Sequence, residues 1–222
     1  MKRVSANLSL GVLLAFTVSA RSELHAGPKS AQFLTIGIRT YTYAQVSPTQ
    51  LAQAKAVAAR ILDRAGIHTV WVDCRLATEA AQGNPKCDQT SGPPIAYFNI
   101  SLVDRFPPEA KITGARTLGF AILPEQGAFG DLVYISLPNI EKYRDEQRAP
   151  LDLVLGLVLA HEIGHLLIGL NEHAPTGIMR AYWEEADLQR AQWGEIQFTA
   201  EQGELLRARA QARTRRESSE AK

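Results

Sequence analysis

Residues 150–169 read PLDLVLGLVLAHEIGHLLIG and place His161, Glu162 and His165 in an almost wholly apolar run. The two histidines are four residues apart, so on an α-helix they share one face, with Cβ atoms roughly 6 Å apart. Both imidazoles can then reach one metal ion. Glu162 lies off that face, where it can touch a water bound to the ion. Burying three such groups is costly without a shared partner, so the stretch predicts a buried helix with a metal site.

The pattern H-E-x-x-H is typical of zinc-dependent peptidases. Zinc lowers the pKa of a bound water to about 7, and a nearby carboxylate can take its proton. Glu162 is therefore the candidate general base, and Zn²⁺ the expected cofactor. The competing interpretation is a chance histidine pair on one helix face with a solvated Glu162, and the apolar context argues against it.

A catalytic zinc usually takes three protein ligands. Residues 169–179 read GLNEHAPTGIM, in which Gly169 allows a sharp turn and His173 can fold back to the metal. Here the chain resembles the metzincin clan of zinc metallopeptidases, whose longer motif H-E-x-x-H-x-x-G-x-x-H precedes a methionine turn. The resemblance implies zinc ligation by His161, His165 and His173, with Glu162 as the base and Met179 as a hydrophobic floor.

The chain departs from the clan's pattern after His165. Gly169 follows it by four residues rather than three, and His173 by eight rather than six. One extra helical residue rotates the exit by about 100°, so the return loop must differ. Met179 can equally be a core methionine. Tyr182, which stands three residues after Met179 instead of two, is a weaker candidate for stabilising the oxyanion.

A rival third ligand is Glu185, which lies 20 residues after His165, close to the spacing of the thermolysin-like clan. Glu184 is one residue away. Their neighbours do not match that clan's context, and the intervening Pro175 and Gly177 fit a turn better than a passage between helices. We therefore favour His173; either residue can also be a solvated surface side chain.

The expected order of elements also resembles the upper domain of the metzincin clan, and this resemblance implies an α+β, zincin-like fold. It comprises a mixed twisted sheet, a backing helix, the active-site helix carrying HEIGH, and a small C-terminal helical subdomain. Strands are expected at residues 33–43, 67–72, 95–103, 118–123 and 131–137. Helices are expected at residues 47–65, 150–169, 184–192 and 199–212, and residues 138–149 read as a loop or short helix. Residues 131–137 are the candidate edge strand for an extended substrate.

The N-terminus has a cationic start, a short apolar run and small residues, which is typical of a secretory signal peptide. We expect a signal peptide at 1–26, one domain at 27–216 and a disordered, solvated tail at 217–222. An uncleaved membrane anchor is the alternative. Cys74 and Cys87 are the only cysteines, and in an oxidising, secreted or periplasmic setting they favour a disulfide.

A formal net charge of +1 over 222 residues gives no nucleic-acid footprint. Residues 151–170 are long enough to resemble a membrane span, but they contain Asp152 and the motif residues, so stable membrane insertion is not expected.

The sequence thus predicts a secreted zinc metalloendopeptidase, acting as a monomer on peptide or protein substrates. Two alternatives stay open: an inactive, zinc-stabilised binding or structural protein, and a zinc hydrolase of cell-wall amides.

Overall fold

The computed structural model describes residues 34–74, 87, 95–112, 116–124, 130–169 and 172–220. They belong to one compact unit, Phe33–Lys222. The predicted signal peptide at 1–26 lies outside the described residues.

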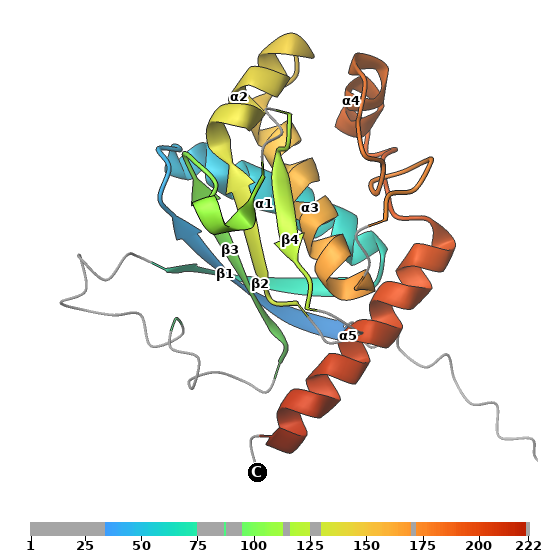
Figure 1. Cartoon of the computed structure of the whole chain (residues 1–222). Helices are drawn as coiled ribbons and strands as arrows, with labels where there is room; N and C mark the ends of the chain where they lie inside the picture. Colours follow the sequence, from blue (N-terminus) through green and yellow to red (C-terminus); the bar gives the residue numbers. More distant parts are fainter. Residues whose placement is uncertain are drawn as a thin grey trace, which may run out of the picture. The chain divides into compact units, whose positions relative to one another are not determined.

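A mixed sheet of five strands forms the centre of this unit (Figure 1). In chain order the strands are β1 (Leu34–Thr42), β2 (Ile67–Cys74), β3 (Tyr97–Val103), β4 (Gly119–Ile122) and β5 (Leu132–Ser136). Their spatial order is β2-β1-β3-β5-β4, with β4 antiparallel to β5 and every other pair parallel. The expected mixed sheet is therefore confirmed.

Residues 131–137, expected to form the edge strand, do not lie at an edge of the sheet. Residues 131–137 contain β5, which lies between β3 and β4. The edge on this side of the sheet is β4, whose Gly119 and Ile122 pair with Ile135 and Leu132. The prediction was wrong because β4, the strand that precedes β5 in the chain, pairs antiparallel with its open side.

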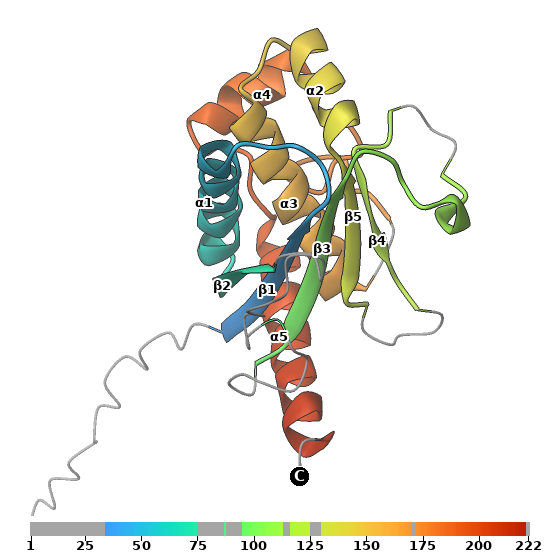
Figure 2. The same ribbon diagram turned by 90° about the vertical axis from the view of Figure 1, so that its left-hand side faces the viewer.

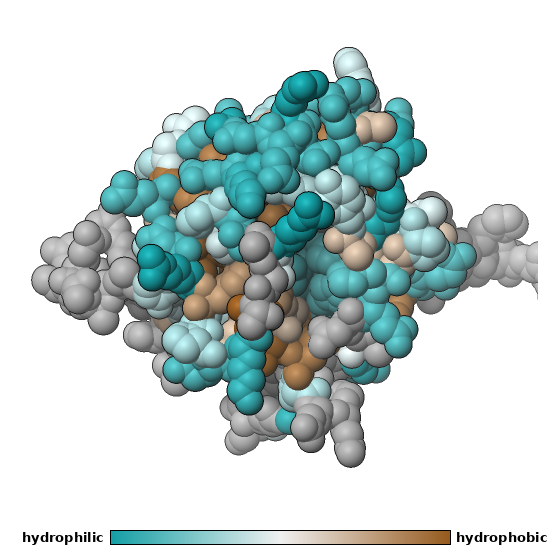
Figure 3. Space-filling model, turned by 45° about the horizontal axis from the view of Figure 1, so that its top comes forward, coloured by the Kyte–Doolittle hydropathy of each residue, from teal (hydrophilic) through white to brown (hydrophobic). Residues whose placement is uncertain are grey.

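Five α-helices complete the described unit. They are α1 (Pro48–Arg64), α2 (Leu137–Glu146), α3 (Leu151–Ile168), α4 (Glu185–Gln192) and α5 (Ala200–Glu220), with a short 3-10 turn, η3, at Pro108–Ala110. Figures 1 and 2 show α1 and α3 packed together on one face of the sheet. The face that carries α2 and α4 is mainly hydrophilic, with hydrophobic residues gathered in a smaller area (Figure 3).

Helix starts follow the capping residues in the sequence. Ser47 accepts a hydrogen bond from the backbone N–H of Gln50, and Pro48 occupies the first turn of α1. Before α5, Thr199 and Gln202 each accept a hydrogen bond from the other's backbone N–H. This reciprocal pair is the capping box that the sequence indicates.

The motif helix α3 is the core of the domain. All of its residues from Leu153 to Leu167 are buried, and Gly169 ends it with a left-handed φ of 76°. By length and composition α3 is the one described helix able to cross a membrane, but 89% of that window is buried within the fold. The core helix of a folded domain passes the same test, so this is weak evidence for a membrane span.

The last helix, α5, continues past the expected end at Ala212 to Glu220. Arg213, which lies beyond the expected end of this helix, is only 7% exposed. Its guanidinium donates to the carbonyls of Gly130 and Tyr97 and lies 4.2 Å from the ring centre of Phe98. A long arginine stem can cover apolar surface while its head group finds polar partners, which charge patterning alone does not reveal.

The expected disulfide joins Cys74, at the end of β2, to Cys87. Such a bond is consistent with an extracellular location, because disulfides persist in oxidising surroundings.

The contact between α1 and α3 depends on Gly156. A Cβ at this position would lie 2.5 Å from the Cβ of Val57 and 2.7 Å from the carbonyl oxygen of Ala54. We predict that Gly156→Ala lowers the free energy of unfolding by about 1–3 kcal/mol, the usual cost of overpacking, in urea denaturation.

The matched control is Gly203→Ala in α5, where the nearest atom to the new Cβ is the flexible end of Arg207 at 3.3 Å. This change should be neutral or stabilise by up to about 1 kcal/mol, because alanine is the better helix former. Equal effects of the two changes would contradict this account of the α1–α3 contact.

Candidate metal centre

Three histidine side chains converge at the side of α3. His161 and His165 are both buried, and their Nε2 atoms lie 2.9 Å apart. His173, from the segment after α3, is exposed, and its ring centre lies 5.3 Å from that of His161. One ring nitrogen from each histidine lies within 4.8 Å of the others. Three imidazoles are a donor set that suits zinc, so the cluster fits a zincin-like site.

The tautomer of His161 is set by a backbone carbonyl. Its Nδ1 lies 2.8 Å from the carbonyl oxygen of Ile178, which can only accept, so Nδ1 carries the proton. Nε2 is then left with a lone pair directed to the cluster, the arrangement that second-shell carbonyls impose on metal-binding histidines. Burial, reinforced by the charge of His165, lowers the pKa of His161 to about 3. The ring is therefore neutral and able to bind a metal.

Glu162 is buried between α3 and the edge strand β4. Burial raises the pKa of its carboxyl to about 8, against the opposing effect of a hydrogen bond from the backbone of Ala121. Its Oε2 has no hydrogen-bond partner among the described residues. A Cβ at Gly119 would lie 3.0 Å from Glu162 Oε1, so glycine leaves room for the carboxyl. An orphaned, buried carboxyl oxygen is the kind of group that a reacting molecule or water would satisfy.

Met179 lies beneath the motif helix. It is 2% exposed, and a Cβ at Gly164 would come within 2.7 Å of its sulfur. Its backbone carbonyl accepts from the N–H of Ala174, which closes the turn that follows His173. This position suits the hydrophobic floor implied by the metzincin resemblance and equally an ordinary core methionine.

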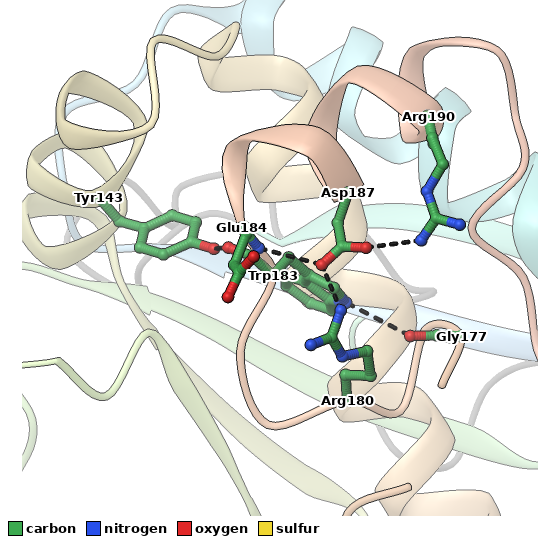
Figure 4. Close-up of polar contacts among 7 residues, drawn as sticks. All are labelled: Tyr143, Gly177, Arg180, Trp183, Glu184, Asp187 and Arg190. Atoms are coloured by element: carbon green, nitrogen blue, oxygen red, sulfur yellow. Dashed lines mark hydrogen bonds and ion pairs between the residues drawn. The ribbon is translucent and has the colours of Figure 1, made fainter. Parts of the chain in front are cut away.

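The segment between His173 and α4 is fixed by a set of polar contacts (Figure 4). Trp183 donates from its indole N–H to the carbonyl of Gly177 at 3.4 Å, and its own carbonyl accepts from the Tyr143 hydroxyl on α2. The Trp183 ring also lies edge-on to His161, with ring centres 5.5 Å apart. These contacts hold the backbone next to Ile178, whose carbonyl orients His161.

Asp187 anchors the same segment to α4. It is 5% exposed, pairs with Arg180 and Arg190, and accepts from the backbone N–H of Glu184 at 3.1 Å. Burial alone would raise the pKa of Asp187, but the hydrogen bonds and the two guanidinium charges outweigh it and lower the pKa. The roles of Tyr143, Trp183 and Asp187 were not predicted from the sequence. The one local pattern that could have indicated Asp187 is the capping box that it forms with Glu184.

The rival glutamates are not in the histidine cluster. Glu184 is the N-cap of α4, where its side chain accepts a backbone N–H, and Glu185 is an exposed residue of the first turn. Among the described residues, the group that could hold a metal contains the three histidines alone.

A pocket of about 290 Å³ opens beside the cluster. Tyr182 lies at this pocket, is 44% exposed, and its hydroxyl accepts from Gln147 at 2.8 Å. The segment Arg116–Gly119, the motif helix and the segment Arg180–Trp183 all contribute to the lining. The lining residues are Arg116, Thr117, Leu118, Gly119, Tyr143, Val158, His161, Glu162, His173, Arg180, Ala181, Tyr182 and Trp183.

No protein-family model matches the chain. No curated protein matches it in sequence either. Among solved structures, the chain is similar to archaemetzincin from Methanopyrus kandleri, with a TM-score of 0.45 and 15% sequence identity, over 83% of this chain and 99% of that one.

We predict that His173 contributes to zinc affinity and that Glu185 does not. His173→Ala should weaken zinc binding by more than about 100-fold, because loss of a ligand should exceed the 10–100-fold typical of outer-shell changes. Competition titration against a chromophoric chelator measures the affinity. Glu185→Ala is the control and should bind zinc as the unchanged protein does; the opposite ranking would move the third ligand to α4.

Proposed function

We propose that this chain is a secreted, zinc-dependent endopeptidase with Glu162 as its general base. The observation that carries the proposal is that three imidazoles converge beside a buried carboxyl. The carboxyl, Glu162, belongs to the same helix as two of the histidines, His161 and His165. Each part has a task in peptide hydrolysis, and the pocket beside them gives a substrate access to both.

The metal ligands in this proposal are His161, His165 and His173. Zinc held by them would polarise the scissile carbonyl and acidify a water molecule. The Ile178 carbonyl keeps the proton of His161 on Nδ1, so that Nε2 stays available for coordination.

Glu162 would move the protons of the reaction. Its Oε2 lacks a hydrogen-bond partner among the described residues, so it is available to accept a proton from the attacking water. The same oxygen can return that proton to the leaving amine.

The substrate would lie extended along β4, which replaces residues 131–137 in this role. The outer side of β4 is the edge of the described sheet, and Gly119 lines the pocket next to Glu162. A peptide can add to such an edge as a further strand, pairing through its backbone. Backbone pairing of this kind would place a scissile bond next to Glu162 without requiring a particular side chain on the substrate.

An open coordination position separates a catalytic zinc site from a structural one. Within the described residues no fourth His, Cys, Asp or Glu joins the three histidines. This favours the enzyme over a zinc-stabilised structural protein. Export through the predicted signal peptide, monomeric action and the absence of nucleic-acid or membrane partners are parts of the same proposal.

We predict that Glu162→Gln binds zinc normally but loses peptide hydrolysis by at least about 10²–10⁴-fold, because general acid–base catalysis contributes that much. Initial rates on a quenched fluorescent peptide library, with zinc content measured in parallel, give both quantities. Glu185→Gln, an exposed carboxyl outside the cluster, should keep full activity. Undiminished turnover in Glu162→Gln would eliminate this mechanism.

A further inference from the structure

The pocket beside the histidines has cationic walls. Arg116 enters it from the segment before β4, and Arg180 from the segment before α4. Among the described residues, Glu162 is the only acidic side chain in its lining, at the buried end next to the histidines. A substrate group that enters between the two arginines therefore meets positive charge.

The charge of Arg180 is only partly cancelled within the protein. Its one anionic partner among the described residues is Asp187, and Asp187 also pairs with Arg190. One carboxylate is thus shared by two guanidinium groups, which leaves an excess of one positive charge. A guanidinium has five N–H donors, and the ion pair with Asp187 uses a single nitrogen of Arg180. The Arg180 side chain is 31% exposed, so a ligand can reach the others.

Arg116 forms no ion pair in the part of the chain that the structure describes, and it is exposed. It also lines a smaller depression that adjoins the pocket, together with Lys142 and Glu146. The charges of Lys142 and Glu146 offset each other, so the net charge of the side chains around the smaller depression is the positive charge of Arg116.

The remaining walls are aromatic and apolar, from Leu118, Tyr143, Val158, Tyr182 and Trp183. Such walls reduce the competition from water and strengthen a charge-assisted hydrogen bond. At about 290 Å³ the pocket lies at the lower end of the range for ligand sites, roughly 300–1,000 Å³. It suits one side chain or chain end better than a large ligand.

We propose that this pocket binds a carboxylate of the peptide substrate, which accepts hydrogen bonds from Arg116 and from the unshared N–H groups of Arg180. The inference rests on the proposed peptidase function and names its substrate class. The carboxylate is either the side chain of an aspartate or glutamate near the scissile bond, or the free C-terminus of the peptide. Arginine suits both, since its planar donor pair matches a carboxylate.

Peptide binding to the Glu162→Gln protein, loaded with zinc, separates recognition from cleavage. One arm uses peptides capped at both ends, in which a single glutamate or a matched glutamine is moved along a neutral sequence. A second arm compares a neutral peptide that ends in a free carboxylate with the same peptide as an amide. Fluorescence anisotropy should show at least roughly tenfold tighter binding of the acidic member in one arm. The arm that responds identifies the source of the carboxylate.

Arg116→Glu tests the assignment of the charge. It should abolish the preference for the carboxylate and favour a matched lysine peptide. Arg60→Glu, an exposed arginine of α1 that does not line this pocket, is the charge-matched control and should leave the preference unchanged. Arg180 is left intact because its ion pair with Asp187 holds the segment in place.

Equal binding of acidic and neutral peptides in both arms would overturn the inference, as would a preference that persists in Arg116→Glu. Cleavage assays on the unaltered, zinc-loaded protein distinguish the two proposals. Cleavage without any charge preference would overturn the carboxylate pocket and leave the peptidase intact. Charge-selective binding without cleavage of any peptide would overturn the peptidase and support the pocket.

Discussion

The cost of burying ionisable groups in an apolar helix constrains this whole structure. His161, Glu162 and His165 are each no more than 6% exposed, within a helix whose other buried residues are almost all aliphatic. Unpaired polar groups in such surroundings cost free energy, so each must have a partner or a reason to lack one. His161 has the Ile178 carbonyl, the two histidines face each other, and Glu162 keeps one oxygen without a partner.

The surrounding elements serve that helix in separate ways. β4 supplies a backbone close to Glu162, made possible by the missing side chain of Gly119. The segment before α4 supplies the carbonyl for His161, and Tyr143 and Asp187 hold that segment at the adjacent residues Trp183 and Glu184. The site therefore depends on residues from α2, β4 and α4 that contribute no metal ligand.

Sequence reasoning succeeded where the signal is local. The Ser47 cap before α1, the Thr199 capping box and the helical spacing of His161 and His165 each depend on residues within four positions of one another. The Cys74–Cys87 disulfide followed from composition and compartment. The predictions failed where the place of a strand or the burial of a side chain depends on contacts with residues farther along the chain. The edge role of β4 is set by β5, and the burial of Arg213 by acceptors at Gly130 and Tyr97. The contact from Tyr143 to Trp183 spans 40 positions and has no pattern that a sequence would reveal.

Arginines of α5 join this helix to segments far earlier in the sequence. Arg207 donates to the carbonyl of Ala65 across 142 positions, and Arg213 reaches Tyr97 across 116 and Gly130 across 83. These contacts cannot form until α5 has been synthesised, after all the strands of the described sheet. Long-range closure of this kind is entropically expensive and slow compared with helix formation. The core beneath α5 is therefore completed only after the earlier helices and strands have formed and α5 packs against them.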